Sequence, residues 1–314
     1  MGRAVGNKFI VLGDAMIDRT YRGTIHRISP EAPVPILDVT DFYDTLGGAG
    51  NVAANVTSLV GKWERVSLLA VGRDSALVDG GEYSDLCIPA HIDAQSPDTE
   101  RHIPVKVRLI ANNQQVYRFD IEERREITEA EEAGLLGLLL RGFDLEGCRA
   151  LVIADYRKGV CTSTLIRDAI GSANDRKIPV FVDTKPDAVA FYRGATLIKL
   201  NRDEASRYLG ATVDKETEWA AEHLRTSVGT SYAVITLAGD GMLYAGPEGA
   251  GHVPAYPGSV VDVTGAGDTV LAALAVAMTD GMGIKEACAF AAECAADVVS
   301  RTGTEVVRME RVTT

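Results

Sequence analysis

The sequence predicts an α/β fold, with a mostly parallel central sheet, helices on both faces of that sheet and a small additional β-sheet. Short, continuously apolar runs alternate with helix-length segments along most of the chain, as in right-handed βαβ units. The runs lack the apolar–polar alternation of a half-exposed strand, so both faces of the central sheet should be covered. Two further segments show strand chemistry without helices, and these predict the small sheet.

Six apolar runs are expected to form the central strands, and seven other segments are expected to be helical. The expected strands are residues 9–13, 66–71, 150–154, 178–182, 196–200 and 232–237. The expected helices are residues 50–60, 127–143, 162–174, 201–209, 215–226, 264–279 and 284–300, of which the last two are rich in small residues.

The small sheet is expected over residues 21–43 and 104–121, where strand-forming residues alternate with polar ones in ILDVTDFY, VKVRLIA and VYRFDI. We expect an antiparallel sheet inserted in the α/β body, with one face free for a substrate or a partner chain. An ordinary edge hairpin is the alternative interpretation. Because no repeat, low-complexity tract or linker is present, the sequence predicts one domain over residues 1–314, with lid segments at about 20–43 and 104–121.

The composition excludes some classes of partner and compartment. The 314 residues include 32 Lys and Arg against 44 Asp and Glu, a formal net charge of −12. Such a surface repels phosphate backbones and anionic lipid, so neither nucleic acid nor membrane is an expected partner, although a local basic pocket for one phosphorylated metabolite is compatible with it. The cysteines lack a C-x-x-C spacing, which predicts free thiols in a reducing compartment; they are Cys87, Cys148, Cys161, Cys288 and Cys294. With no secretory leader and no apolar run of ~20 residues, the chain is expected to be cytoplasmic.

The most informative motif is VDVTGAGDT at residues 261–269, where a strand or loop leads into an apolar helix. Gly265 and Gly267 allow a tight turn and a close approach of the backbone to a ligand. The following helix presents unpaired N–H groups and the positive end of its dipole, a combination that favours an anion. Asp268 in its first turn is either a helix cap or the base that phosphoryl transfer needs for an attacking hydroxyl.

A second glycine cluster, LGGAGNVA at residues 46–53, also opens a helix and suggests close packing against a ligand, with Asn51 as a polar contact. A glycine-rich turn capped by Asn51 is the alternative. The cluster does not directly follow a strand and has no obvious acid about twenty residues further on, so dinucleotide binding is disfavoured. The sequence contains no G-x-x-x-x-G-K-[ST] motif, which excludes a P-loop kinase, and no G-x-S-x-G motif of an α/β-hydrolase.

Polar residues follow five of the expected strands at the point where each strand ends. Open α/β sheets bind ligands at this edge. Any one of these groups alone is more simply a turn or a helix cap, whereas five along one edge indicate a site. The groups are Asp14 with Asp18, Asp155 with Lys158, Asp183 with Lys185, Asn201 with Glu204, and residues 238–241.

The segment TGAGD at residues 264–268, preceded by Asp262, resembles the C-terminal signature of the ribokinase (PfkB) family of carbohydrate kinases. GGAGNVA at residues 47–53 resembles the N-terminal signature of the same family, and the likeness covers residues 8–308. The resemblance implies a ribokinase-like fold and an ATP-dependent phosphotransferase that acts on an alcohol group of a sugar.

A closer resemblance is to the kinase domain of the heptose phosphate kinases. These enzymes phosphorylate D-glycero-β-D-manno-heptose 7-phosphate at O1 on the route to ADP-heptose for the lipopolysaccharide core. RISPEAPVP at residues 27–35 is the most specific match, and further matches lie at residues 113–120, 155–160, 183–185 and 201–204.

The resemblance implies roles for individual residues. Asp268 would be the general base, and the backbone N–H groups of Gly265, Ala266 and Gly267 would form an anion hole for the transferring phosphoryl group. Residues expected to face ATP are Asn201, Arg202, Asp203, Glu204, Thr236, Gly239, Gly241 and Thr264, with Mg²⁺ near Glu204 and a requirement for K⁺ left open. Residues expected to face the sugar phosphate are Asp14, Asp18, Gly47, Gly48, Asn51, Arg108, Arg118, Asp155, Lys158 and Lys185, of which Arg108 or Arg118 would meet the 7-phosphate.

Residues 75–102 depart from the family pattern, which leaves the exact sugar open. The chain ends at residue 314, without room for the cytidylyltransferase-like domain of bifunctional relatives, so we expect another polypeptide to carry out any adenylylation. The alternatives are a kinase of a different sugar, sugar phosphate or nucleoside, a non-catalytic sugar or nucleotide binder, and an NAD-dependent oxidoreductase. The intact Asp268 and its glycine turn disfavour the binder, and the imperfect dinucleotide motif disfavours the oxidoreductase. The exposed strands of the small sheet predict a homodimer.

Overall fold

The computed structural model describes residues 7–61, 64–72, 92–97, 99–144 and 148–312. Cys87 and most of the atypical segment 75–102 lie outside the described residues. The other four cysteines are free thiols, as the sequence predicts. Within the described ranges, no helix combines the length and the apolar character needed to cross a bilayer.

The central sheet has nine strands in the order β13-β12-β11-β10-β9-β8-β1-β4-β5. Every pairing from β5 to β11 is parallel, whereas β12 and β13 add antiparallel pairings at one edge. The sequence predicts six of these strands and misses the other three, β5, β12 and β13. The bounds are β1 (Asn7–Gly13), β4 (Arg65–Leu69), β5 (Ile92–Gln95), β8 (Ala150–Ala154), β9 (Val180–Asp183), β10 (Leu197–Asn201), β11 (Tyr232–Thr236), β12 (Met242–Gly246) and β13 (Gly249–Val253).

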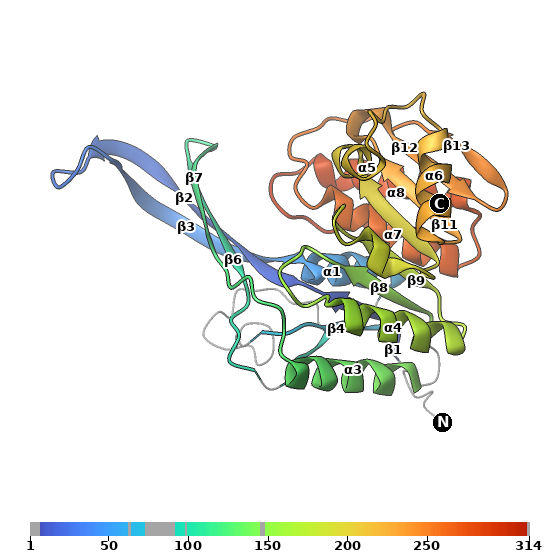
Figure 1. Ribbon diagram of the computed structural model, residues 1–314. Helices are drawn as coiled ribbons and strands as arrows, with labels where there is room; N and C mark the ends of the chain where they lie inside the picture. Colours follow the sequence, from blue (N-terminus) through green and yellow to red (C-terminus); the bar gives the residue numbers. More distant parts are fainter. Residues whose placement is uncertain (1–6, 62–63, 73–91, 98, 145–147, 313–314) are drawn as a thin grey trace.

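Helices cover both faces of this sheet, which confirms the predicted fold class (Figure 1). Alternate residues of β1 point to opposite faces, so that Phe9 and Val11 belong to one buried cluster and Ile10 and Leu12 to the other. The first cluster includes residues of α1 (Ala49–Val60), α7 (Ala266–Thr279) and α8 (Ile284–Val299). The second includes residues of α3 (Glu129–Asp144), α4 (Ser163–Asp175), α5 (Arg202–Leu209) and α6 (Trp219–Val228).

A second sheet of four strands extends from the α/β body as a long arm (Figure 1). Its order is β3-β2-β6-β7, with bounds β2 (Ala15–Ile28), β3 (Pro35–Gly48), β6 (Val105–Ala111) and β7 (Gln114–Ile121). The β2–β3 and β6–β7 pairings are antiparallel, but β2 and β6 are parallel, so the expectation of an antiparallel sheet is wrong at this pairing. The reason is that the chain leaves the arm after β3, passes through α1, β4 and β5, and enters β6 in the direction of β2.

Candidate active site

The polar residues that follow the central strands share one edge of the sheet, as predicted. The strands β1, β8, β9, β10 and β11 are neighbours in the sheet. Their register sets Gly13 beside Ala154, Ala154 beside Asp183, and Asn201 beside Thr236. The loops after these five strands therefore open on the same side of the molecule, at the carboxyl edge where α/β sheets bind ligands.

Asp268 lies in the first turn of α7 and has only 5% of its surface exposed. Its two carboxylate oxygens accept hydrogen bonds from neutral groups: Asn51 Nδ2 donates to Oδ2 at 2.8 Å, and the hydroxyl of Tyr156 donates to Oδ1. Burial raises the pKa of Asp268 to about 6, and the two hydrogen bonds limit this rise. Such a carboxylate is mostly deprotonated at neutral pH and is more basic than an ordinary aspartate, as a general base requires.

The turn before α7 depends on glycine. Gly265 is the N-cap residue and has a φ of 80°, in the left-handed region that favours glycine. A Cβ at this position would lie 2.7 Å from Nδ2 of Asn51, the group that holds Asp268. Of the three predicted anion-hole groups, the N–H of Ala266 also donates to the carbonyl of Val263, over a long 3.3 Å.

Asp262 fixes the other side of this turn. Its Oδ1 accepts the N–H of Thr264 at 2.9 Å and the hydroxyl of Thr264 at 2.7 Å. Its Oδ2 accepts the N–H of Gly303 at 2.9 Å, which ties the turn to the segment after α8. Thr264, which the resemblance assigns to ATP, is thereby held in place at the entrance to α7.

Lys199 is a buried lysine behind the turn, and the sequence analysis did not select it. Its ammonium donates to Oδ2 of Asp183 at 2.6 Å and to the carbonyl of Gly267 at 3.1 Å. Burial raises the pKa of Asp183, whose Oδ1 is also buried and has no hydrogen-bond partner among the described residues. A lysine inside the apolar run LIKLN is unusual in a covered strand, and this signal could have identified it.

Tyr156 connects the candidate base with the loop after β8. Its hydroxyl donates to Asp268, and its backbone N–H donates to Oδ2 of Asp14 at 2.9 Å. Its ring lies near two ammonium groups, with the ring centre 5.2 Å from Nζ of Lys185 and 5.6 Å from Nζ of Lys106. The sequence analysis noted Tyr156 only within a matching segment, because nothing local signals a contact with a residue 112 positions away.

Asp14 and Asp155 also shape this loop. Asp14 is buried and accepts three backbone N–H groups from the 156–160 loop at 2.9 to 3.1 Å, while burial raises its pKa to about 6. Oδ2 of Asp155 accepts the hydroxyls of Thr184 at 2.9 Å and Tyr192 at 2.8 Å. The sugar contacts that the resemblance assigns to both aspartates stay predictions, beside a structural role that both have.

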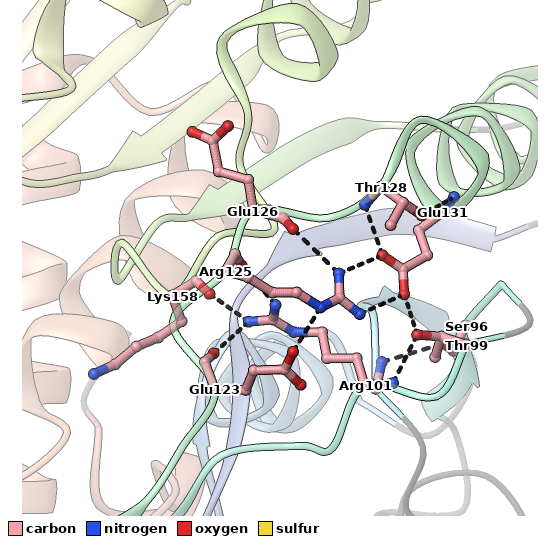
Figure 2. A network of polar contacts seen from close by, with 10 residues as sticks. Ser96, Thr99, Arg101, Glu123, Arg125, Glu126, Thr128, Glu131 and Lys158 are labelled. Carbon is pink, nitrogen blue, oxygen red and sulfur yellow. Dashed lines mark hydrogen bonds and ion pairs between the residues drawn. The ribbon is translucent and has the colours of Figure 1, made fainter.

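A network of polar contacts around Arg101 also holds the 156–160 loop, through the carbonyl of Lys158 (Figure 2). The guanidinium of Arg101 is 1% exposed and donates to the carbonyls of Glu123 at 3.0 Å, Arg125 at 2.7 Å and Lys158. Arg125 in turn donates to both carboxylate oxygens of Glu131, at 2.8 and 3.0 Å. Figure 2 shows the side chain of Lys158 extending away from these contacts. We call this set the Arg101 network; it comprises Thr99, Arg101, Glu123, Arg125, Thr128, Glu131 and the carbonyl of Lys158.

The residues assigned to ATP lie where β10 and β11 end. Asn201 caps α5 in a reciprocal pair with Glu204, in which each side chain accepts the other residue's N–H at 2.9 Å. Lys185 donates to Oε1 of Glu204 at 2.5 Å, and Arg202 forms an ion pair with Asp240. The remaining assigned residues are Asp203 in the first turn of α5, Thr236 at the end of β11, and Gly239 and Gly241 in the turn after it.

The predicted magnesium position at Glu204 has a limited donor set. Both carboxylate oxygens of Glu204 already accept hydrogen bonds. Among the residues that the structure describes, no group of three or more His, Cys, Asp or Glu side chains could hold a metal ion. Mg²⁺ usually binds through one or two carboxylates, waters and substrate phosphates. The residues present therefore fit an ion held mainly by ATP, and not an all-protein cage.

The residues assigned to the sugar lie where the second sheet joins the body. Gly47 and Gly48 end β3 and lead into α1, which carries Asn51. Gly47 lies so close to Asp18 on β2 that a Cβ would come 2.5 Å from Oδ2 of Asp18. A side chain at Gly47 would therefore displace this carboxylate.

Arg108 and Arg118, the predicted partners of the 7-phosphate, both hold a carboxylate of this chain. Arg108 on β6 donates to Oδ1 of Asp18 at 2.6 Å. Arg118 on β7 donates to both oxygens of Asp120, at 2.8 and 2.7 Å. The structure thus brings both arginines close to the predicted substrate side but gives each a partner, and the distant Arg108–Asp18 pair is the one that the sequence could not show.

Comparison with known proteins gives a match to the pfkB family of carbohydrate kinases over residues 7–310. The bifunctional protein HldE of Geobacter metallireducens is 38% identical over 309 residues, covering 95% of this chain and 60% of that protein. HldE of Caulobacter vibrioides is 39% identical over 321 residues, covering 98% of this chain and 63% of the relative. The chain thus spans about 60% of the length of these relatives.

Solved structures with the same fold include phosphofructokinase-2 from Escherichia coli in complex with potassium. It is 19% identical with a TM-score of 0.77, covering 98% of this chain and 97% of that one. Ribokinase of Arabidopsis thaliana, complexed with ribose and ATP, is 18% identical with a TM-score of 0.66 and covers 95% and 94% of the two chains. At these identities the likeness concerns the fold, and it confirms the ribokinase-like architecture.

Proposed function

We propose that this chain, which belongs to the pfkB family of carbohydrate kinases, transfers the γ-phosphoryl group of ATP to O1 of D-glycero-β-D-manno-heptose 7-phosphate. Membership of the family makes it a phosphotransferase that uses ATP and acts on a sugar hydroxyl. The observation that carries the mechanism is the buried carboxylate of Asp268, held by neutral donors at the N-terminus of α7. The heptose is supported by identities of 38% and 39% to HldE proteins and by the segment at residues 27–35.

Asp268 accepts the proton of the attacking sugar hydroxyl. Asn51 and Tyr156 each donate one hydrogen bond to a different oxygen of Asp268, so they orient the carboxylate and leave lone pairs for the substrate. The sugar oxygen then forms its bond to the γ-phosphorus as the bond to the bridging oxygen of ADP breaks. Because this chemistry depends mainly on in-line positioning and charge stabilisation, a rigidly held base is the protein's direct contribution.

Negative charge on the transferring phosphoryl group is stabilised at the N-terminus of α7. The N–H groups of residues 265–267 and the helix dipole supply partial positive charge there. Two lysines lie near this turn, each paired with a carboxylate. Lys199 contacts Asp183 and the carbonyl of Gly267 behind the turn. Lys185 contacts Glu204 and the ring of Tyr156. This pairing of a helix terminus with fixed cations suits a reaction in which several phosphate charges must be held together.

We assign Mg²⁺ to the phosphates of ATP, with Glu204 as the protein carboxylate that would bind it, and the bound ion would neutralise phosphate charge. A requirement for K⁺ is supported by the potassium complex of phosphofructokinase-2 from Escherichia coli. We assign the reaction to the cytoplasm, because Cys148, Cys161, Cys288 and Cys294 are free thiols.

We further propose that the second sheet mediates a homodimer. Large apolar side chains are exposed along β3 and β7, the two edge strands of this sheet: Val39, Phe42, Val116, Tyr117, Phe119 and Ile121. Exposed apolar groups of this size on an open sheet mark an interaction surface. Sedimentation should give a dimer that Tyr117→Asp weakens, and a monomer at micromolar concentration would contradict this proposal.

The test of the function is ATP consumption by the purified chain with Mg²⁺ across a panel of acceptors. The panel contains D-glycero-D-manno-heptose 7-phosphate, sedoheptulose 7-phosphate, fructose 6-phosphate, ribose and adenosine. We expect turnover with the manno-heptose phosphate and its loss in Asp268→Asn. Turnover of a different acceptor alone would overturn the heptose assignment and keep the family reaction. Turnover that survives in Asp268→Asn would overturn the role of Asp268.

A further inference from the structure

Four basic side chains lie together where the second sheet meets the loop after β8. Lys106 and Arg108 stand two residues apart on β6 and therefore share a face of the sheet. Arg118 lies opposite Arg108 on the neighbouring strand β7, and Lys158 lies in the loop after β8. Burial lowers the pKa of Lys106, Asp18 opposes this shift, and the charges of Arg118, Lys158 and Arg108 add to it. The four cations are therefore close enough to repel one another.

Three of the four cations pair with a carboxylate, and one of these carboxylates, Glu122, also pairs with the exposed Arg124. Asp18 accepts from Arg108 at 2.6 Å, Asp120 accepts from Arg118 at 2.8 and 2.7 Å, and Glu122 forms an ion pair with Lys158. Of these four cations, Lys106 is therefore the one that pairs with no carboxylate of the described chain.

Lys106 has no anionic partner in the described part of the chain. Its ammonium makes no hydrogen bond or ion pair there. The group beside it is the ring of Tyr156, whose centre lies 5.6 Å from Nζ of Lys106. Asp18 and Asp120 lie opposite Lys106 on the two neighbouring strands, but Arg108 and Arg118 occupy them. Holding an ammonium partly out of water without an anion is unfavourable, so this position favours a ligand that supplies one.

We propose that Lys106 binds the phosphate group of the sugar substrate, and that it, and not Arg108 or Arg118, distinguishes phosphorylated from unphosphorylated acceptors. This inference rests on the proposed function, since an acceptor without a phosphate has nothing to give Lys106. The phosphate supplies the anion that Lys106, alone of the four cations, lacks. Lys158, fixed through its carbonyl by Arg101 and through its ammonium by Glu122, borders the same position.

Tyr156 relates this position to the reacting atoms. Its hydroxyl donates to Asp268, while Lys106 lies near its ring. A sugar whose reacting hydroxyl meets Asp268 therefore reaches Lys106 by extending across Tyr156. The other lysine at this ring, Lys185, is bound to Glu204 at the start of α5, on the side assigned to ATP. Lys185 therefore lies on the side assigned to ATP, and Lys106 lies on the side assigned to the sugar acceptor.

Steady-state kinetics of the full chain test this assignment. Lys106→Met removes the charge and keeps the aliphatic stem, Lys106→Arg keeps a charge, and Lys285→Met on the exposed face of α8 is the matched control. We expect Lys106→Met to raise KM for heptose 7-phosphate by about 10- to 100-fold, the range for a lost charged hydrogen bond, and to leave KM for ATP within about twofold. The KM for the unphosphorylated heptose should change little in Lys106→Met. Equal losses for the two acceptors, or a rise confined to ATP, would overturn the proposal.

A binding experiment separates this inference from the heptose assignment. Inorganic phosphate and fructose 6-phosphate are titrated calorimetrically into the wild-type chain and the variants without ATP. Binding that is lost in Lys106→Met and kept in Lys285→Met supports the site even if no heptose phosphate is turned over. Binding unchanged in Lys106→Met, or absent from the wild-type chain, overturns it even if heptose phosphate is the substrate. Because Lys106→Met removes an uncompensated charge, we expect its melting temperature to be no lower than that of the wild-type chain.

Discussion

Two polar clusters meet at the 156–160 loop, and they treat buried charge in opposite ways. In the Arg101 network, Arg125 pairs with Glu131, and the guanidinium of Arg101 donates to three carbonyls (Figure 2). At the candidate active site, the hydrogen bonds to Asp268 come from an amide and a phenol, and those to Asp14 come from backbone N–H groups. The first cluster neutralises its charges, whereas the second holds carboxylates out of water with neutral donors.

The difference appears in the pKa values of the carboxyl groups. The hydrogen bonds from Arg125 hold the pKa of Glu131 well below its usual range. Burial instead raises the pKa of both Asp268 and Asp14 to about 6. A carboxylate that is unfavourable in the folded state is the expected signature of a reacting group, whereas a satisfied one stabilises the fold. Each prediction below changes one cluster and leaves the other intact.

The largest expected effect is on activity, in Asp268→Asn. The amide can accept from Asn51 and donate to the hydroxyl of Tyr156, so the fold should persist while the base is lost. We expect kcat to fall by ~10²–10⁴-fold with little change in sugar affinity. Initial rates at saturating ATP and sugar measure this, with Glu216→Gln in an exposed loop as the control. A kcat within tenfold of the wild-type value would contradict the assignment.

The next largest effect should be a loss of stability in Arg101→Met. The change leaves the carbonyls of Glu123, Arg125 and Lys158 without their buried donor and removes a buried cation from the network. We expect the free energy of unfolding to fall by about 3 kcal/mol, since unsatisfied buried groups are costly. Urea titration measures it.

The matched control for Arg101→Met is Arg225→Met, which removes an arginine paired with Glu222 on the surface of α6. We expect this variant to change stability by no more than about 0.5 kcal/mol. If the two substitutions destabilise the chain equally, the Arg101 network has no special structural role.

The two clusters should also respond differently to acid. The pKa of Asp268 is raised from 3.8 to about 6 on folding, so its stabilising contribution is complete only below its unfolded value and is lost as pH rises through 6. At pH 7, Asp268→Asn should therefore be more stable than the wild-type chain by on the order of 2–3 kcal/mol, and this gap should close between pH 6 and 4. Unfolding titrations between pH 4 and 8 measure the gap.

Glu131→Gln should change the free energy of unfolding in the opposite direction. The lowered pKa of Glu131 contributes stability above its ordinary value of 4.5, and this contribution is lost only as pH falls below that value. The variant should therefore be less stable than the wild-type chain throughout the range from pH 5 to 8. A gap of the same sign for Glu131→Gln and Asp268→Asn would remove the distinction between the clusters.

The sequence predicts the parts of this molecule that depend on local pattern. Continuous apolar runs identify six central strands, and the glycine turn before Asp268 identifies the candidate base, because both signals lie within a few residues. Tyr156 is missed because its significance depends on Asp268, which is distant in sequence. Lys199 stands out locally in the apolar run LIKLN, but its partners Asp183 and Gly267 are distant in sequence. The parallel β2–β6 pairing is missed for the same reason, since it depends on how the chain returns through the body.

Ionic partners are harder still to predict. The resemblance to the heptose phosphate kinases offers Arg108 and Arg118 for a phosphate. Asp120 lies two residues from Arg118 on the same strand, but only the cross-strand register reveals that Arg108 reaches Asp18 and that Lys106 has no acid left to pair with. Pairing in a sheet is a property of neighbouring strands, so it is invisible in any one of them.

The smallest effect should come from Tyr156→Phe, which removes one donor to Asp268 and keeps the ring near Lys106 and Lys185. The hydrogen bond from Tyr156 lowers the pKa of Asp268 against the larger effect of burial, so its loss should raise that pKa further, by on the order of one unit. The acid limb of the kcat/KM profile, which reports the free enzyme, should therefore move to higher pH, with a several-fold loss near pH 6 and nearly wild-type rates at pH 8. Rates that fall equally at all pH values would mean that Tyr156 acts by positioning the sugar. An unshifted profile with wild-type rates would mean that Asn51 alone suffices to hold the base.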